Sequence, residues 1–420
     1  MRKKKLLITL FAVLLTCSTS AAQKFDFGSG KATPGHVRVL PATRYSDEQG
    51  FGFEEGAVVE ARGDSITSDQ PPFYFSVKVP AEGNYKVTVT LGNSEAESVT
   101  TVKAELRRLM LERVRTRAGQ FETRTFIVNT RTPKIPGGGE VRLKDRERTS
   151  EAWAWDDRLT LEFTDAHPAV HAVEIEKVEH IPTIYIAGDS TSTDQPVEPF
   201  NSWGQMLTRF FKPEIAIANH GESGESLKGF LGERRLEKVM SLIQPGDYLF
   251  IQMGHNDQKE RGEGVGAFTT YRADLKRFIA EAREHGATPV VITPVNRMSF
   301  EAGTGTIVSS LGDYPEAVRQ AANEENVALI DLNAMSKPFY EALGPQEAHV
   351  AFAGNDKTHH SNYGSYELAK CIVEGIKANQ LPIAKYLVDV PKFDPAHPDP
   401  FDQFDVPAEP KGPAVKPYGN

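Results

Sequence analysis

The chain has 420 residues, a formal net charge of −9 and two cysteines. Its acidic balance does not favour nucleic acid or an anionic membrane surface as a partner. With so few cysteines the fold must rest on a hydrophobic core, and a chain of this length suggests two or more domains.

The N-terminal segment, residues 1–22, has the pattern of a secretory signal peptide. Basic residues from Arg2 to Lys5 stand directly before an apolar run from Leu6 to Leu15, and Ser20-Ala21-Ala22 offers a small-x-small cleavage site. The apolar run is too short to span a bilayer, and no other run in the chain is long enough. We therefore predict an exported protein, periplasmic or extracellular, cleaved after Ala22 and without a transmembrane segment.

The number of cysteines in the mature chain depends on this cleavage. Loss of the signal segment removes Cys17 and moves the formal charge from −9 to −13. Cys371 is then alone, and its place in the apolar pattern of residues 368–376 predicts a packed helix residue rather than a nucleophile. A lipid anchor on Cys17 is a less favoured alternative, because Thr16 directly before it fits a lipoprotein signal poorly.

Residues 23–180 have the pattern of an all-β sandwich. Residues 73–79 and 85–91 alternate between apolar and polar side chains, and Pro80-Ala81-Glu82-Gly83-Asn84 between them is turn chemistry. Residues 102–117 leave two interpretations open, one helix or two strands that meet around Glu112. Several antiparallel strands separated by Gly and Pro turns favour a sandwich. Further short strands are expected at residues 121–128, 159–163 and 170–178.

From residue 181 to about 385, short apolar strands alternate with amphipathic helices. This pattern indicates an α/β domain with a parallel sheet covered on both faces. The remaining tail, 386–420, is rich in Pro and Asp, and we expect it to wrap the surface or to be partly disordered. The expected strands are residues 183–187, 215–218, 248–252, 289–292 and 327–330, and the expected helices are 202–211, 227–243, 267–285, 314–325 and 362–378.

Four short segments of this second region carry chemistry. They are Gly188-Asp189-Ser190, the glycine at Gly224, Gly254-His255-Asn256-Asp257, and Asp356-Lys357-Thr358-His359. Ligands of open parallel sheets bind at the carboxyl ends of the strands. The first three segments follow expected strands and the fourth precedes the last expected helix, so all four can meet at one edge of the sheet.

Ser190, His359 and Asp356 are a candidate catalytic triad. Ser190 would attack a carbonyl, His359 would take its proton and later pass it to water, and Asp356 would orient the imidazole. His360 is a rival base, but the three-residue spacing from Asp356 favours His359. Each residue alone has an ordinary explanation, such as a helix cap for the serine or a surface turn for Asp-x-x-His. The order of the segments therefore carries the prediction.

A tetrahedral oxyanion also needs hydrogen-bond donors. The backbone N–H groups of Ser190 and Gly224 and the side-chain amide of Asn256 are the candidates, and glycine suits this role because no Cβ blocks the ligand. His255 and Asp257 are candidate substrate-binding residues, with positioning of the loop by hydrogen bonds as the alternative. No spacing of His and carboxylates competes with the triad as a metal site, and no cofactor is expected.

These segments resemble the GDSL/SGNH hydrolases, which are named for Ser, Gly, Asn and His in four blocks. The matching positions are Ser190, Gly224, Asn256 and His359, with Asp356 completing the triad. The Leu that follows the serine in the GDSL name is replaced here by Thr191-Ser192-Thr193. The resemblance spans about residues 181–380 and implies a flavodoxin-like three-layer hydrolase domain.

Within that superfamily, the chain looks more particularly like the rhamnogalacturonan acetylesterases, which remove acetyl groups from pectin backbones. The resemblance rests on Gly188 to Thr191, on Asn219 followed by Gly224-Glu225-Ser226, and on Gly254 to Asp257. Glu225 departs from the Arg that those enzymes usually have after the glycine, which bears on substrate contacts but not on the backbone donor.

The first region resembles the galactose-binding-like sandwich of some bacterial pectin esterases. The similarity lies in Phe25-Asp26-Phe27-Gly28, in residues 45–53 and in the strands after Phe73. Such a module would bind sugar or brace the catalytic domain. Trp153 and Trp155 would stack on a sugar ring in the first case and pack in the core or between domains in the second.

The sequence predicts an exported carbohydrate O-acetylesterase that acts on acetylated plant cell-wall polysaccharide, in particular pectic rhamnogalacturonan. The Gly-x-Ser-x-Gly elbow of the common lipase fold is absent from the chain. Two alternatives stay open. One is the same chemistry on another ester, such as acetylated xylan, sialic acid or a lipid, and the other is a non-catalytic polysaccharide-binding protein. The intact set of triad and oxyanion residues argues against the second.

Overall fold

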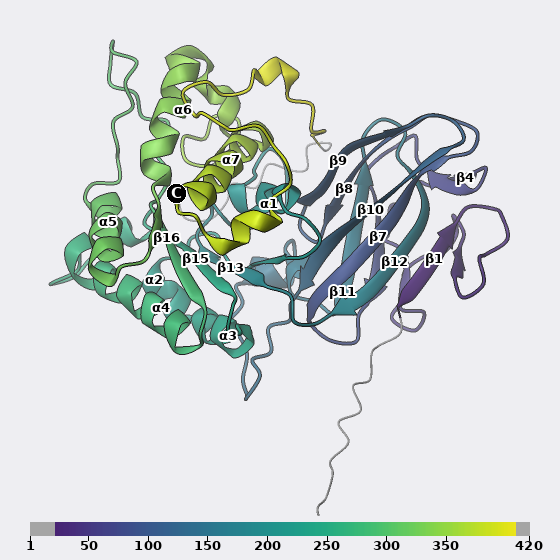
Figure 1. Cartoon of the computed structure of the whole chain (residues 1–420), viewed down its shortest axis with the longest axis horizontal. Coiled ribbons are helices and arrows are strands. Elements are labelled where there is room, and N and C mark those ends of the chain that lie inside the picture. The colour runs from purple at the N-terminus through teal and green to yellow at the C-terminus, as the bar shows by residue number, and fades with distance from the viewer. Residues whose placement is uncertain (1–21, 409–420) are drawn as a thin grey trace, which may run out of the picture.

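The computed structural model of the chain describes residues 22–408. Of the predicted signal peptide only Ala22 falls in this range, so the export signal and Cys17 lie outside the described residues. A pair of β-sheets and a layered α/β region lie side by side and are joined near residue 180 (Figure 1). No helix among residues 22–408 is long and apolar enough to cross a membrane.

The N-terminal region is a sandwich of two sheets, as predicted. Inward side chains of both sheets, among them Val87, Val89 and Phe75, form one buried cluster between them. The first sheet has the order β10 (Gln120–Thr130), β7 (Gly83–Asn93), β12 (Ala169–Val178), β1 (Gln23–Phe27) and β2 (Val37–Val39), and β5 (Ser65–Thr67) pairs with both β12 and β4 (Glu60–Arg62). The second sheet has the order β3 (Phe51–Phe53), β6 (Phe73–Lys78), β11 (Arg158–Thr164), β8 (Ser98–Ala104) and β9 (Arg108–Thr116).

The sequence of residues 102–117 is compatible with one helix or with two strands. In the structure this segment belongs to the hairpin of β8 and β9. The turn lies at residues 105–107 and not around Glu112, so that part of the expectation is wrong. Glu105 and Arg107 take left-handed backbone conformations, with φ of 56° and 62°. Arg107 reaches from this turn into the second region and forms a buried ion pair with Glu198. Tertiary contacts, not local pattern, therefore decide where the chain turns.

The second region contains a parallel sheet with all the expected strands. Its order corresponds to 2-1-3-4-5 in chain order, which is the flavodoxin-like arrangement, and the order reverses beside the first strand. That reversal opens the crevice in which such folds bind their ligands. The strands in spatial order are β14 (Ala216–Asn219), β13 (Thr183–Gly188), β15 (Tyr248–Gln252), β16 (Thr288–Ile292) and β17 (Ala328–Ile330).

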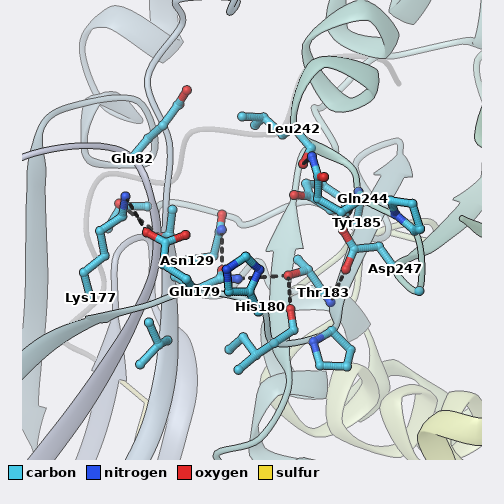
Figure 2. Close-up of a pocket in the computed structure, with 18 residues that line it drawn as sticks. Glu82, Asn129, Lys177, Glu179, His180, Thr183, Tyr185, Leu242, Gln244 and Asp247 are labelled. Atoms are coloured by element: carbon cyan, nitrogen blue, oxygen red, sulfur yellow. Dashed lines mark hydrogen bonds and ion pairs between the residues drawn. The ribbon is translucent and has the colours of Figure 1, made fainter. Parts of the chain in front are cut away.

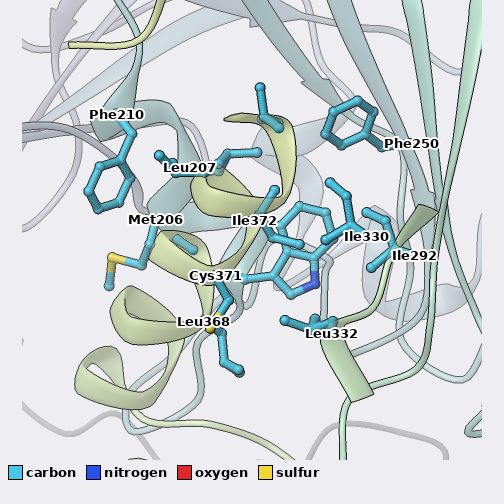
Figure 3. Close-up of a cluster of buried hydrophobic side chains, with 14 of the residues drawn as sticks. Met206, Leu207, Phe210, Phe250, Ile292, Ile330, Leu332, Leu368, Cys371 and Ile372 are labelled. Atoms are coloured by element: carbon cyan, nitrogen blue, oxygen red, sulfur yellow. The ribbon is translucent and has the colours of Figure 1, made fainter. Parts of the chain in front are cut away.

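Helices cover both faces of this sheet, which completes the predicted three layers. Ile184 and Ile186 of β13 face one helical layer and Tyr185 and Ala187 face the other, as the two-residue period of a strand requires. Cys371 is fully buried in the first layer, so it is a packed residue as predicted (Figure 3). The first layer contains α1 (Trp203–Leu207), α6 (Leu332–Glu347) and α7 (Asn362–Ala378), and the second contains α2 (Leu227–Gly232), α3 (Arg235–Leu242), α4 (Arg272–Glu284) and α5 (Tyr314–Glu325).

Some helices differ from the expectation. The single helix expected over 227–243 is divided into α2 and α3, because Arg234 between them has a left-handed φ of 63°. The helix expected over 267–285 begins with a π turn at Ala267–Tyr271 before α4. Helix α6 was not expected, since Pro338 lies inside it and proline normally breaks a helix. The helix is kinked at Gly344, whose backbone is not helical (φ 74°, ψ 168°), and Pro345 follows this kink. The apolar face of α6 packs in the first-layer core, which outweighs the local cost.

The C-terminal tail follows the surface as far as the described residues extend. Phe401 and Phe404 pack on Tyr363 of α7, with ring centroids 5.3 and 5.6 Å away. Asp405 forms a 2.9 Å ion pair with Arg113 of β9, so the tail touches both regions. Short 3₁₀ turns complete the described chain at Asp145–Arg148, Ala152–Ala154, Thr208–Phe210, Asp257–Lys259, Ala348–Ala351, Pro382–Tyr386 and Phe401–Gln403.

Candidate active site

Ser190 and His359 meet at the carboxyl edge of the parallel sheet. Ser190 lies on the loop after β13, and His359 lies on the loop before α7. His359 Nε2 is 2.9 Å from Ser190 Oγ, and His359 Nδ1 is 3.1 Å from Asp356 Oδ2. In this arrangement the imidazole can take the serine proton on one side, while the carboxylate fixes its tautomer on the other.

Asp356 closes a tight turn beside the imidazole. Its Oδ1 accepts hydrogen bonds from the backbone N–H groups of Thr358 at 2.6 Å and His359 at 2.9 Å. Burial by itself would raise the pKa of this carboxyl, but these hydrogen bonds and the one from the His359 ring outweigh burial and hold the pKa well below its usual range. Asp356 is therefore ionised at neutral pH, as an orienting carboxylate must be.

The candidate oxyanion donors follow the neighbouring strands β13, β14 and β15. Gly224 has a φ of 80°, a left-handed conformation that favours glycine. Among residues 22–408, no acceptor takes the backbone N–H of Ser190 or Gly224. The Asn256 amide donates to Glu225 O at 3.0 Å, and its Oδ1 accepts from Lys259 Nζ at 3.2 Å, so one amide hydrogen stays available. Donors that are free at the carboxyl ends of neighbouring strands are suited to stabilise a developing oxyanion.

His255 and Asp257 are buried on either side of Asn256. His255 Nδ1 lies 3.2 Å from Asp189 Oδ2 and its Nε2 lies 3.0 Å from Val295 O. Asp257 Oδ1 accepts the backbone N–H of Leu227, the first residue of α2, at 2.8 Å. Both side chains thus tie the Asn256 loop to its neighbours. These contacts support the positioning alternative over direct contact with a substrate.

His360, the rival base, faces the core. Its Nε2 lies 2.7 Å from the Tyr340 hydroxyl, and the ring packs between Tyr340 and Phe352. Burial, together with the neighbouring His359, lowers the pKa of His360 to about 3. A neutral imidazole packed in this way does not reach Ser190, whereas His359 does, which favours His359 as the candidate base.

Some contributors to the site were not identified from the sequence. Asp189 accepts from the Thr191 backbone N–H at 2.9 Å and from its hydroxyl at 2.8 Å, and so holds the turn that carries Ser190. Its place inside Gly-Asp-Ser was the available signal. Lys144 and Arg146 come from the N-terminal region and pair with Glu225 and Glu222 around Gly224. No local pattern connects these segments, so only the tertiary structure reveals them.

Of the two tryptophans considered for sugar stacking, Trp155 is buried and Trp153 is half-buried. Trp155 is buried, with the Arg131 guanidinium carbon 4.4 Å from its ring centroid, and it meets the edge of His220 after β14 at 6.0 Å. Trp153 packs against Tyr74 of β6 at 5.0 Å. The contact of Trp155 with both regions supports the packing alternative rather than stacking on a sugar.

A cavity of about 590 Å³ lies between the two regions, far from the triad (Figure 2). Its lining includes Asn129 and Lys177 from the sandwich and Thr183 and Asp247 from the α/β region. Thr183 begins β13 and Asp247 directly precedes β15, so this cavity opens at the amino ends of the strands. Within residues 22–408, no group of three or more His, Cys, Asp and Glu side chains is placed to hold a metal ion.

Comparison with known proteins places both regions in families. Residues 186–399 match the GDSL-like lipase/acylhydrolase family, and residues 23–110 match the beta-agarase/YXIM esterase-like, galactose-binding domain-like family. Rhamnogalacturonan acetylesterase RhgT of Bacillus subtilis (strain 168) is 39% identical over 220 residues, which cover 49% of this chain and 94% of that protein.

A second relative is similar along both regions. The uncharacterized esterase YxiM of Bacillus subtilis (strain 168) is 28% identical over 380 residues, which cover 84% of this chain and 90% of that protein. The crystal structure of YxiM aligns with a TM-score of 0.48 and 25% identity, covering 86% of this chain and 99% of the other.

Proposed function

Because the chain belongs to the GDSL-like lipase/acylhydrolase family, we propose that it is an exported esterase that removes acetyl groups from pectic rhamnogalacturonan through Ser190, His359 and Asp356. The observation that carries the mechanism is the chain of contacts from Ser190 Oγ through the His359 ring to Asp356, at 2.9 and 3.1 Å. The choice of polymer is supported by the similarity to rhamnogalacturonan acetylesterase RhgT, at 39% identity over 220 residues.

The proposed reaction has two halves. Ser190 Oγ attacks the acetyl carbonyl carbon while His359 Nε2 takes the serine proton, and the resulting oxyanion accepts hydrogen bonds from the Ser190, Gly224 and Asn256 donors. The bond between the carbonyl carbon and the sugar oxygen then breaks, and His359 gives the proton to that oxygen as the sugar leaves as an alcohol. Water, deprotonated by His359, attacks the acetyl-serine, and acetate leaves as Ser190 recovers its proton.

The enzymatic proposal is tested with an aryl acetate and the Ser190→Ala variant. Removal of the nucleophile should lower kcat by about 10⁴-fold or more, because the acyl-enzyme can no longer form. Circular dichroism should show that the variant keeps its fold. Equal rates for the wild type and the variant would contradict the role of Ser190.

The substrate is tested by acetate release from acetylated rhamnogalacturonan and from acetylxylan, measured side by side as kcat/KM. We expect a preference for the pectic polymer. A clear preference for xylan would overturn the pectin assignment and leave the esterase mechanism intact. Export is tested separately, by N-terminal sequencing of the protein recovered outside the cytoplasm, which should begin at Gln23.

A further inference from the structure

The peptide group between Ser223 and Gly224 accepts hydrogen bonds from the N-terminal region. Lys144 and Arg146 lie at the 3₁₀ turn Asp145–Arg148, which follows the sandwich strand β10. Lys144 Nζ donates to the Ser223 carbonyl oxygen at 3.0 Å, and Arg146 Nη2 donates to the same oxygen at 2.5 Å. Two cationic side chains from one region therefore converge on a single carbonyl of the other.

The Ser223 carbonyl and the Gly224 N–H belong to the same peptide group. In a planar trans peptide the C=O and N–H bonds point in opposite directions. When Lys144 and Arg146 bond to the carbonyl oxygen, the N–H of the same peptide therefore points away from them. Hydrogen bonds to charged groups are strong, and a bond accepted at the carbonyl polarises the peptide so that its N–H becomes a better donor.

Ion pairs on both sides hold the same loop. Lys144 pairs with Glu225, and Arg146 pairs with Glu222, with Arg146 Nε 2.7 Å from Glu222 Oε1. The two carboxylate side chains are 1% and 5% exposed, whereas Lys144 and Arg146 are 22% and 24% exposed. Without the cations the loop would bury uncompensated carboxylates, which is costly. Lys144 and Arg146 of the N-terminal region therefore compensate the two buried carboxylates of this loop.

We propose that Lys144 and Arg146 are positioning residues that orient and polarise the Gly224 N–H as an oxyanion donor. The N-terminal β-sandwich region is then a part of the active site and not only a separate module. The inference rests on the proposed acyl-transfer function, because it assigns these residues to the oxyanion of that reaction. Both side chains act through the Ser223–Gly224 peptide and not on the substrate.

The test compares Lys144→Gln, Arg146→Gln and the double variant with the wild type in aryl acetate hydrolysis. The double variant should lower kcat by about 10- to 100-fold, less than the 10²- to 10³-fold typical for complete loss of an oxyanion donor, while KM stays nearly constant. A trifluoromethyl ketone, whose tetrahedral adduct on Ser190 carries an oxyanion, should lose affinity by a similar factor.

Conservative and control variants separate positioning from general loosening. Lys144→Arg and Arg146→Lys keep a cationic donor and should recover most of kcat. Arg148→Gln removes an exposed cation from the same turn and should leave kcat unchanged. The contact between Glu82 and Lys238 joins the two regions at another place, with Lys238 Nζ 2.7 and 2.8 Å from the Glu82 carboxylate oxygens. Glu82→Gln weakens this contact. It should lower Tm without lowering kcat.

The outcomes distinguish this inference from the proposed function. If the wild type shows no Ser190-dependent hydrolysis, the proposed function itself fails. If it does, and the folded Gln variants keep wild-type kcat or change only KM, this inference alone is overturned. An equal loss of kcat in Glu82→Gln would also overturn it, because the effect would then follow the contact between regions. Should the double variant fail to fold, the single Lys144→Gln variant carries the same comparison with a smaller expected change.

Discussion

Two carboxyl groups beside the site are held in opposite ionisation states. Asp356 is kept charged by hydrogen bonds from His359 and backbone N–H groups, in spite of its burial. Asp257 is fully buried, and burial raises the pKa of its carboxyl to about 8. Its Oδ1 accepts from the Leu227 N–H, and its Oδ2 has no partner among residues 22–408. The same residue type therefore serves as an orienting anion in one loop and as a neutral buried group in the next.

Asp257 predicts a pH dependence of stability. The pKa in the folded chain, about 8, exceeds the ordinary aspartate value of 3.8. The folded state therefore holds a proton that the unfolded state releases, and stability falls as pH rises between these values. The free energy of unfolding should fall less steeply from pH 5 to pH 8 in Asp257→Asn than in the wild type, by up to about 1.4 kcal/mol per pH unit. Urea unfolding at each pH measures this, and parallel curves would contradict it.

Some residues of the candidate active site could be predicted from the sequence and others could not. The order of the segments predicts Ser190, His359 and Asp356 as a set, and in the structure they lie within hydrogen-bond distance of one another in the order Ser190–His359–Asp356. Their chemical roles remain part of the proposed function. Lys144 and Arg146 were not predicted, because a lysine or arginine in a polar loop is usually solvated and carries no local mark of a distant partner.

At the scale of elements, the ends of strands and the beginnings of helices position the side chains of the candidate active site. Helix α7 begins directly after the His359 loop, and Ser361 caps it by accepting the Gly364 N–H at 3.2 Å. A Cβ on Gly364 would lie 1.9 Å from the Ala351 carbonyl oxygen, so only glycine permits this approach of helix and turn. The contact fixes α7 against the turn that precedes the His359 loop.

Gly364→Ala should therefore destabilise the protein by about 1–3 kcal/mol, because the backbone at Ala351 must move to admit a methyl group. The matched control is Gly232→Ala at the end of α2, where a Cβ would meet nothing within 4 Å. That variant should be as stable as the wild type or slightly more stable. Denaturant titration of both proteins measures the difference, and equal stability of the two variants would contradict the packing argument.

The elements themselves were predictable where local patterns act alone. The parallel strands and helix α5 follow from apolar runs and helical periodicity, which depend on neighbours in the sequence. Helix α6 was missed because Pro338 opposes it locally and Gly344 kinks it, while its packing partners lie elsewhere in the chain. The division at Arg234 was missed for a similar reason, since Arg235 beside it turns toward Glu147 of the sandwich region.

At the scale of the whole molecule, buried ion pairs join the two regions. Glu147 and Arg235 are fully buried and lie 2.5 Å apart, and Arg108 lies 3.0 Å from Asp194 in the loop after Ser190. Buried pairs of this kind cost much when one partner is removed, because the other charge is left uncompensated. The two regions are therefore expected to unfold together.

Glu147→Gln should lower the free energy of unfolding by about 3 kcal/mol, because it leaves the buried Arg235 charge without its main partner. Glu237→Gln is the matched control, since it removes an exposed partner of the adjacent Arg234 and should leave stability unchanged within error. Scanning calorimetry should give one transition for the wild type and for both variants. Two separate transitions in the wild type would show that the regions unfold independently.

The amino-acid sequence by itself determined the change from an all-β pattern to alternating strands and helices, the strands of the parallel sheet and the set of candidate catalytic side chains. These features depend on periodicity and on residue types that are close in the chain. Only the tertiary structure decided that the residues beside Asn256 bond to neighbouring loops, that His360 belongs to the core, and that Lys144 and Arg146 donate to the carbonyl of the Ser223–Gly224 peptide. The reason is physical: hydrogen bonds and ion pairs act over a few ångströms in space, and here they join residues far apart along the chain.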